Sequence, residues 1–143
     1  IGYVGEPKSV NPAVLDTLTG SDIIPVIAPV GIGEDGSTYN INADTAAGAI
    51  AAAVGAKRLL MLTDIAGVLN SEGQLITNVS AAEAESLIDD GTIAGGMIPK
   101  TETALDAVEG GVRAAVIIDG RAPNACLLEL FTEQGAGSMI RAD

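Results

Sequence analysis

Two short polar motifs precede segments that are otherwise apolar, and they hold the residues best suited to chemistry. Asn40–Asp44 (NINAD) places two amides and a carboxylate before a run of Ala, Gly and Ile, and Lys100 closes GGMIPK (95–100). Amide donors, a carboxylate and an ammonium beside glycine-rich backbone at helix N-termini can hold a phosphate and stabilise charge as it moves. The chain has no histidine, so it offers no imidazole that could act as a general base.

Helix capping is the simpler explanation for part of this pattern. An Asn or Asp near a helix start is common, and the carboxylate of Asp44 would favour the positive end of the helix dipole. Capping accounts for one polar side chain, whereas Asn40, Asn42 and Asp44 supply three. A lysine early in a helix is unfavourable for the same dipole, so Lys100 indicates an anion bound beside it.

The main strands are predicted from continuous apolar runs, which are typical of buried strands. These runs are 23–30, 59–63 and 114–118. Pro25 and Pro29 place the first run at a sheet edge or give it an irregular end. Shorter strands are predicted at 38–41, 75–79 and 138–141.

Helices are predicted between these strands, at 12–19, 44–55, 80–89, 98–109 and 123–131. Segment 44–55 is apolar on nearly every face and should be buried. Ser80 and Glu83 form a capping box. The alternation of strands and helices predicts one α/β domain over residues 1–143, a three-layer αβα sandwich with a mainly parallel sheet.

Loops at the carboxyl edge of such a sheet are where ligands bind. Asp64–Leu69 follows a predicted strand, and the loop Asp90–Gly96 is rich in short side chains, so its backbone could approach a ligand closely. A plain turn or connection also explains each of them. Asp119–Pro123 is best explained as a turn with a surface contact of Arg121.

A glycine-rich loop, Gly31–Gly36, matches the G-x-G-x-x-G spacing of dinucleotide-binding folds. Glu34 and Asp35 would repel a pyrophosphate, and the third glycine does not open a helix. A hairpin tip is therefore the better interpretation.

The composition limits the classes of partner. The net charge of −12 argues against nucleic acid and anionic membranes, although a local lysine and backbone N–H groups can still bind an anion. No apolar run reaches the ~18 residues of a membrane span. A single cysteine, Cys126, allows no intrachain disulfide and favours a cytoplasmic protein. The chain starts at Ile1, in a segment of sequence that is typical of the middle of a domain. We therefore expect this chain to be part of a longer protein.

Four motifs occur in an order that resembles the amino-acid kinase family: NINAD, LTDIAGVL, GGMIPK and IIDGRAPNACLLELFTEQGAGSMI. The resemblance is closest to the branch that phosphorylates N-acetyl-L-glutamate, and it covers nearly the whole chain. It implies the carbamate kinase-like fold, of which only the C-terminal, nucleotide-binding half is matched. The family's N-terminal half contains a glycine-rich phosphate loop, a second lysine and most of the acyl-amino-acid pocket.

This resemblance implies transfer of the γ-phosphoryl group of ATP to the side-chain carboxylate of N-acetyl-L-glutamate, in arginine biosynthesis. Lys100 would stabilise the transferring group, Asp44 would orient the catalytic lysines, and Asn40 and Asn42 would bind the substrate. Mg²⁺ would sit on the ATP phosphates, and no protein ligand for a metal is assigned. The residues implied to line ATP are Asp64, Ile65, Ala66, Gly67, Val68, Leu69, Thr92, Ile93 and Ala94.

The tail resembles the arginine-sensitive members of the family. This likeness implies that the feedback inhibitor arginine binds near Glu133, Gly135 and Gly137, although an ordinary loop before a last strand is the alternative. Arginine-sensitive members tend to be homo-oligomers, and some bind a PII signalling protein.

Other functions stay open at this point. The chain could belong to another amino-acid kinase, such as aspartokinase or glutamate 5-kinase. It could act as a non-catalytic fragment that binds a nucleotide or arginine. The hypothesis of a dinucleotide-dependent oxidoreductase rests on the glycine loop alone. We expect the chain by itself to be inactive as a kinase, because the second lysine and the substrate pocket lie outside it.

Overall fold

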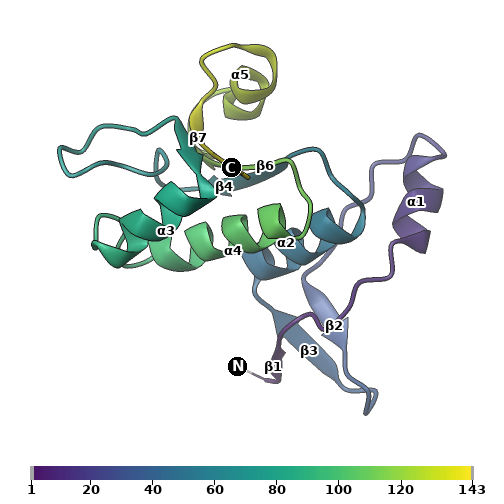
Figure 1. Ribbon diagram of the computed structural model, residues 1–143. Helices are drawn as coiled ribbons and strands as arrows, with labels where there is room; N and C mark the ends of the chain where they lie inside the picture. Colours follow the sequence, from purple (N-terminus) through teal and green to yellow (C-terminus); the bar gives the residue numbers. More distant parts are fainter. Residues whose placement is uncertain (1, 143) are drawn as a thin grey trace.

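The computed structural model describes residues 2–142, which form two sheets and five helices (Figure 1). In chain order the elements are β1 (Val4–Gly5), α1 (Ala13–Thr19), β2 (Val30–Ile32), β3 (Thr38–Ile41), α2 (Ala43–Ala53), β4 (Leu59–Thr63), β5 (Asn78–Ser80), α3 (Ala81–Asp89), α4 (Met97–Glu109), β6 (Ala114–Asp119), α5 (Ala125–Phe131) and β7 (Gly137–Arg141).

The larger sheet has the strand order β4-β6-β7-β5. β4 is parallel to β6 and β5 is parallel to β7, whereas β6 and β7 are antiparallel. Helices α2, α3 and α4 lie on one face of this sheet and α5 lies on the other (Figure 1). The predicted αβα sandwich is confirmed, with a mixed sheet because β7 runs against its neighbour β6.

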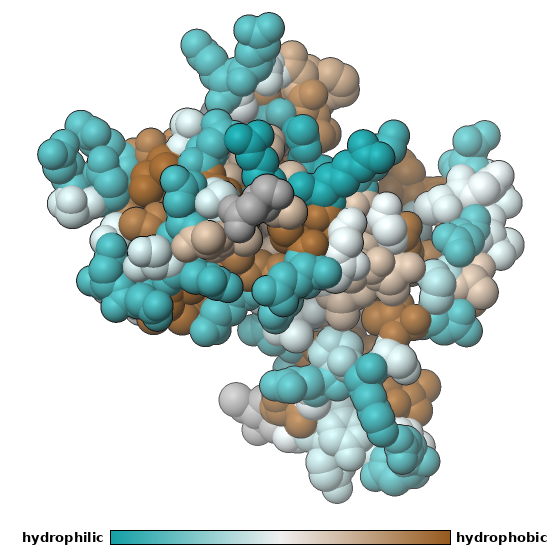
Figure 2. Space-filling model, in the orientation of Figure 1, coloured by the Kyte–Doolittle hydropathy of each residue, from teal (hydrophilic) through white to brown (hydrophobic). Residues whose placement is uncertain are grey.

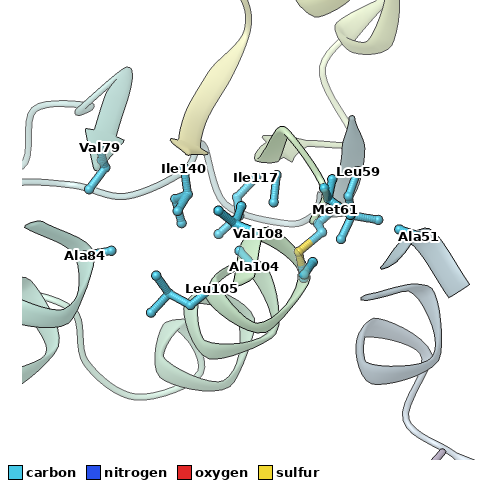
Figure 3. Close-up of a cluster of buried hydrophobic side chains, with 13 residues drawn as sticks. Ala51, Leu59, Met61, Val79, Ala84, Ala104, Leu105, Val108, Ile117 and Ile140 are labelled. Atoms are coloured by element: carbon cyan, nitrogen blue, oxygen red, sulfur yellow. The ribbon is translucent and has the colours of Figure 1, made fainter. Parts of the chain in front are cut away.

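The core is organised around β6, whose alternate side chains enter two separate clusters. Ala115 and Ile117 pack with α4, and Val116 and Ile118 pack with Ala125 of α5. Figure 3 shows strand side chains, including Ile117, pointing onto α4. Burying one large aliphatic side chain contributes about 1.5–3 kcal/mol, so this strand fixes α4 firmly against the sheet.

The smaller sheet has the order β1-β3-β2 and lies beyond α2, apart from the larger sheet (Figure 1). β2 and β3 form an antiparallel hairpin. At its tip the backbone N–H of Gly33 donates to the carbonyl of Ser37 at 2.8 Å, and Gly36 has a φ of +79°. The G-x-G-x-x-G spacing is therefore a hairpin tip, as the sequence indicated.

The prediction of a buried strand over 23–30 is wrong. Residues 23–28 form no strand, and Ile24 and Val26 are 89% and 96% exposed. Pro25 and Pro29 cannot donate backbone hydrogen bonds, and within residues 2–142 only Val30 of this segment pairs in a ladder. Figure 2 shows hydrophobic surface beside the hairpin. The segment is thus an open apolar surface rather than a core strand.

Two further predictions need correction. In α2 only Gly48 and Ala51 are buried, because one side of the helix packs on α4 while the other borders open cavities. The strand predicted over 75–79 begins later, at Asn78, and Leu75 instead forms an isolated bridge with Leu69.

The start of α3 gives a pH-dependent prediction. Hydrogen bonds from the backbone and the side chain of Ser80 lower the pKa of Glu83 from its usual value of 4.5. Because the folded pKa lies below the unfolded one, this carboxylate stabilises the fold fully above pH 4.5, and the contribution is lost as the pH falls through the folded pKa. We expect Glu83→Ala to lower the melting temperature at about pH 7 and to have a smaller effect at about pH 3.

The matched control is Glu85→Ala, which removes an exposed carboxylate from the same helix outside the capping box. Thermal melts of both variants at the two pH values measure the effect. Equal losses for the two variants would show that the capping box contributes nothing specific.

Candidate functional site

The central feature of the site is an ion pair between the first turns of α2 and α4. Asp44 is near the start of α2 and Lys100 is near the start of α4, 56 positions apart in the sequence. The Lys100 ammonium donates to Oδ2 of Asp44 at 2.7 Å, and the two side chains are 25% and 31% exposed. Partial burial shields this contact from solvent, so it is stronger than a surface ion pair.

Asn42 holds the start of α2 in place. Its Oδ1 accepts hydrogen bonds from the backbone N–H groups of Asp44 at 2.9 Å and Thr45 at 3.3 Å, which is an N-cap. The side-chain carbonyl of Asn42 is thus engaged by the helix, and its NH₂ group is the part suited to bind a ligand. The cap fixes the backbone from which the Asp44 carboxylate projects.

The ion pair lines an open cavity of about 640 Å³ between α2 and α4. Asn42, Gly96 and Thr45 also line this cavity, and so do the acidic residues Glu6 and Glu102. A cation at a helix N-terminus opposes the helix dipole, and the Asp44 carboxylate offsets this cost. An anion that enters the cavity would find an ammonium group already positioned and backbone N–H groups at the helix ends.

Asn40 lies in β3, two residues before the cap, and its side chain is exposed. Its backbone pairs with Val4 of β1 on one side and Val30 of β2 on the other. Asn40 does not line the cavity of the ion pair. The structure therefore places it next to the site along the chain, on the smaller sheet.

The segment Asp64–Leu69 follows β4 and is tied to β7 by Ser138. The hydroxyl of Ser138 accepts from the backbone N–H of Val68 at 2.8 Å and donates to the carbonyl of Ile76 at 2.6 Å. Gly67 has a φ of +143°, and a Cβ there would lie 2.5 Å from Ser138 Oγ. Ser138 was missed by the sequence analysis, because one serine in a strand carries no pattern that links it to a loop 70 residues away.

The segment Thr92–Ala94 connects α3 to α4. Thr92 donates its backbone N–H to Oδ1 of Asp90 at 2.9 Å, and hydrogen bonds from Thr92 lower the pKa of Asp90. The Ile93 side chain is 3% exposed, so it belongs to the core. Neither this segment nor Asp64–Leu69 lines the cavity that holds Lys100.

The carboxyl ends of β4 and β6 bring charged residues together. Asp119 accepts hydrogen bonds from Nε and Nη2 of Arg121, both at 2.9 Å. This contact lowers the pKa of Asp119 and raises the pKa of Arg121, to which Asp64 also contributes. The predicted turn with an arginine contact is confirmed, and its charges lie near the start of Asp64–Leu69.

The tail forms a second polar cavity of about 190 Å³, lined by Arg58, Glu129, Glu133, Gly135 and Gly137, among others. The buried carboxylate of Glu129, 4% exposed, lies 3.4 Å from Nη1 of Arg58 and accepts from the backbone N–H of Ala136 at 2.9 Å. Gly137 pairs with Ile118, and a Cβ at Gly137 would run into the carbonyl of Ile117. Gly137 is therefore also required by the β6–β7 ladder.

Two further observations concern metal ions and membranes. Among residues 2–142, no group of three or more histidine, cysteine or acidic side chains is arranged to hold a metal ion. No helix in the described part of the chain is long and apolar enough to cross a bilayer.

The fold and the site define an α/β sandwich domain whose polar centre is a carboxylate–ammonium pair at two helix N-termini. The sequence profile of the Amino acid kinase family matches residues 1–119. The chain belongs to this family.

Two similar curated proteins are acetylglutamate kinases. The chain is 66% identical over 143 residues to the one from Roseobacter denitrificans and 66% identical over 140 residues to the one from Rhodospirillum centenum. These matches cover 100% and 98% of this chain, but 50% and 46% of the two relatives. The chain thus spans about half the length of the curated relatives it matches.

Solved structures agree with the fold. N-acetylglutamate synthase from Neisseria gonorrhoeae, complexed with coenzyme A and L-arginine, superposes with a TM-score of 0.92 at 31% identity, over 99% of this chain and 33% of that one. Carbamate kinase from Giardia lamblia bound to AMP-PNP superposes with a TM-score of 0.76 at 19% identity, over 98% of this chain and 47% of that one. The second likeness shows the fold alone.

Ser138 supports a prediction about the loop that it anchors. Ser138→Ala leaves the buried N–H of Val68 without its acceptor, which should cost about 1–3 kcal/mol in the free energy of unfolding. Chemical denaturation measures this change. Ser71→Ala, in an exposed turn, is the control and should change stability little. Equal stability of the Ser138 variant and the unmodified protein would contradict an anchoring role.

Proposed function

We propose that this chain is the ATP-binding half of an acetylglutamate kinase. The enzyme transfers the γ-phosphoryl group of ATP to the side-chain carboxylate of N-acetyl-L-glutamate, in cytoplasmic arginine biosynthesis. The observation that carries the proposal is the 2.7 Å contact between Lys100 and Asp44 at the N-termini of α4 and α2. The 66% identity to acetylglutamate kinases supports the choice of substrate within the family.

The proposed reaction needs no general base, because the attacking group is already a carboxylate. Catalysis then depends on positioning and on stabilising the charge of the transferred phosphoryl group. Lys100 supplies the positive charge, and Asp44 orients Lys100. Asn40 and the NH₂ group of Asn42 bind N-acetyl-L-glutamate. Mg²⁺ arrives with ATP and is held mainly by the phosphate oxygens.

The nucleotide occupies the carboxyl edge of β4 in this proposal. Asp64–Leu69 and Thr92–Ala94 line the adenosine and the phosphates, largely through backbone, since the side chains of Val68 and Ile93 are buried. The anchoring of Val68 on Ser138 supports this role, because a fixed loop loses less entropy when a ligand binds. These two segments do not line the cavity of the ion pair.

The apolar surface around residues 23–32 is where we place the N-terminal substrate lobe of the enzyme. Ile24, Val26 and Ile32 are largely exposed there. Ile27, Val30 and Ile32 line a cavity of about 500 Å³ that reaches Ile50 of α2. Large exposed apolar patches mark interaction sites, and the chain spans about half of its relatives. In this proposal the chain alone lacks the second catalytic lysine and most of the substrate pocket, so it is inactive.

A second proposed function is feedback inhibition by arginine at the 190 Å³ cavity of the tail. The carboxylates of buried Glu129 and exposed Glu133 can accept hydrogen bonds from a guanidinium group. Gly135 and Gly137 have no side chains that would obstruct the cavity. The likeness to an N-acetylglutamate synthase solved with L-arginine supports this assignment. As part of the same proposal, the full-length enzyme is a homo-oligomer and binds a PII signalling protein.

The test of the first function uses the full-length protein and a panel of acceptors: N-acetyl-L-glutamate, L-aspartate, L-glutamate and carbamate. We expect ATP-dependent phosphorylation of N-acetyl-L-glutamate. Lys100→Ala should lower kcat by about a hundredfold or more while ATP affinity changes little, because the lysine acts mainly in the transition state. Asp44→Asn should also lower kcat and keep the fold.

Lys57→Ala removes an exposed lysine elsewhere and is the control for the loss of one positive charge. An unchanged kcat for Lys100→Ala would remove Lys100 from the mechanism. Preference for another acceptor would point to a different amino-acid kinase, and binding of NADH but not of ATP would contradict the nucleotide assignment.

A further inference from the structure

The helices that carry the ion pair touch each other one turn away from it. Gly48 follows Asp44 by four residues and Thr103 follows Lys100 by three, so each lies on the same helix face as its charged neighbour. A Cβ built on Gly48 would lie 3.0 Å from Cγ2 of Thr103 and 3.5 Å from its carbonyl oxygen. α2 and α4 are in close contact here, and a methyl group on Gly48 would require Thr103 or the two helices to shift by a few tenths of an ångström.

We propose that Gly48 and Thr103 are positioning residues that set the distance between the Asp44 carboxylate and the Lys100 ammonium. This inference rests on the proposed kinase function. The separation of two packed helices is determined by the side chains at their contact. A glycine opposite a threonine methyl therefore fixes how far the start of α2 stands from the start of α4.

α4 is fixed to the sheet by the buried residues Ala104, Leu105 and Val108, so α2 takes up most of any change in the helix separation. The Asn42 cap joins the first turn of α2 to the helix start, so Asp44 moves with the helix. The Lys100 side chain is long enough to follow a shifted carboxylate. Its ammonium would then move relative to the phosphoryl group, and misplacement by a fraction of an ångström lowers the rate rather than the affinity.

The same pair of helices offers a matched control at its other end. A Cβ on Gly110, the C-cap of α4, would lie 2.9 Å from Cβ of Ala52. Gly110 has an ordinary φ of −70°, so its substitution by alanine strains the helix contact without strain in the backbone. It lies ten residues beyond Lys100, about 15 Å along the helix.

The experiment measures kcat, KM for ATP and melting temperature in the full-length enzyme. Gly48→Ala should lower kcat about tenfold with KM for ATP within about twofold. Thr103→Ala removes the methyl that the new Cβ meets, so Gly48→Ala/Thr103→Ala should regain kcat to within about twofold of the protein with Thr103→Ala alone. Gly110→Ala should lower the melting temperature and leave kcat within about twofold.

A kcat for Gly48→Ala equal to that of the active wild-type enzyme would overturn the positioning role, and so would equal losses of kcat for Gly48→Ala and Gly110→Ala. If Gly48→Ala does not fold, the double variant decides: a tenfold loss of kcat at a normal melting temperature contradicts the proposal. A wild-type enzyme that does not phosphorylate N-acetyl-L-glutamate contradicts the proposed function instead, so the two failures are distinguishable.

Discussion

The burial of β6 between two helical layers is the constraint on which the site depends. Ile117 and Ile118 are both fully buried, one toward α4 and the other toward α5. Once α4 is held against this strand, the position of Lys100 at the start of α4 is determined. α2 then packs on α4 rather than on the smaller sheet, and this contact brings Asp44 to Lys100. The chemistry at the helix N-termini is therefore a consequence of aliphatic packing at the middle of the larger sheet.

The elements that the sequence predicts well are those with a local cause. β4 and β6 are continuous apolar runs and form strands. β6 is buried, whereas β4 is an edge strand in which Leu62 is 54% exposed. The capping box of Ser80 and Glu83 is present where α3 begins. The segment 23–30 has the same apolar character, but residues 23–28 form no strand. An apolar run indicates that a segment tends to be buried. It does not identify the element or chain against which the segment packs. Within residues 2–142 nothing pairs with 23–28, so the prediction of a strand was wrong there.

The site shows the same division between local and distant causes. Polar residues at helix starts identify Asn42, Asp44 and Lys100, and the capping role of Asn42 is also local. The contact between Asp44 and Lys100 joins residues 56 positions apart, and no sequence spacing predicts it. Ser138 and Gly48 act through tertiary contacts as well. A glycine in an alanine-rich helix looks like a weak helix former until the neighbouring helix is seen beside it.

The most direct test of the central claim is a crystal structure of the full-length protein with Mg²⁺, a non-hydrolysable ATP analogue and N-acetyl-L-glutamate. The account predicts that the terminal phosphate lies within hydrogen-bonding distance of the Lys100 ammonium, with Asp44 still paired to Lys100 and the adenosine against Asp64–Leu69. Phosphates bound away from Lys100, for example at Arg121, or an Asp44 carboxylate turned away from Lys100, would contradict it.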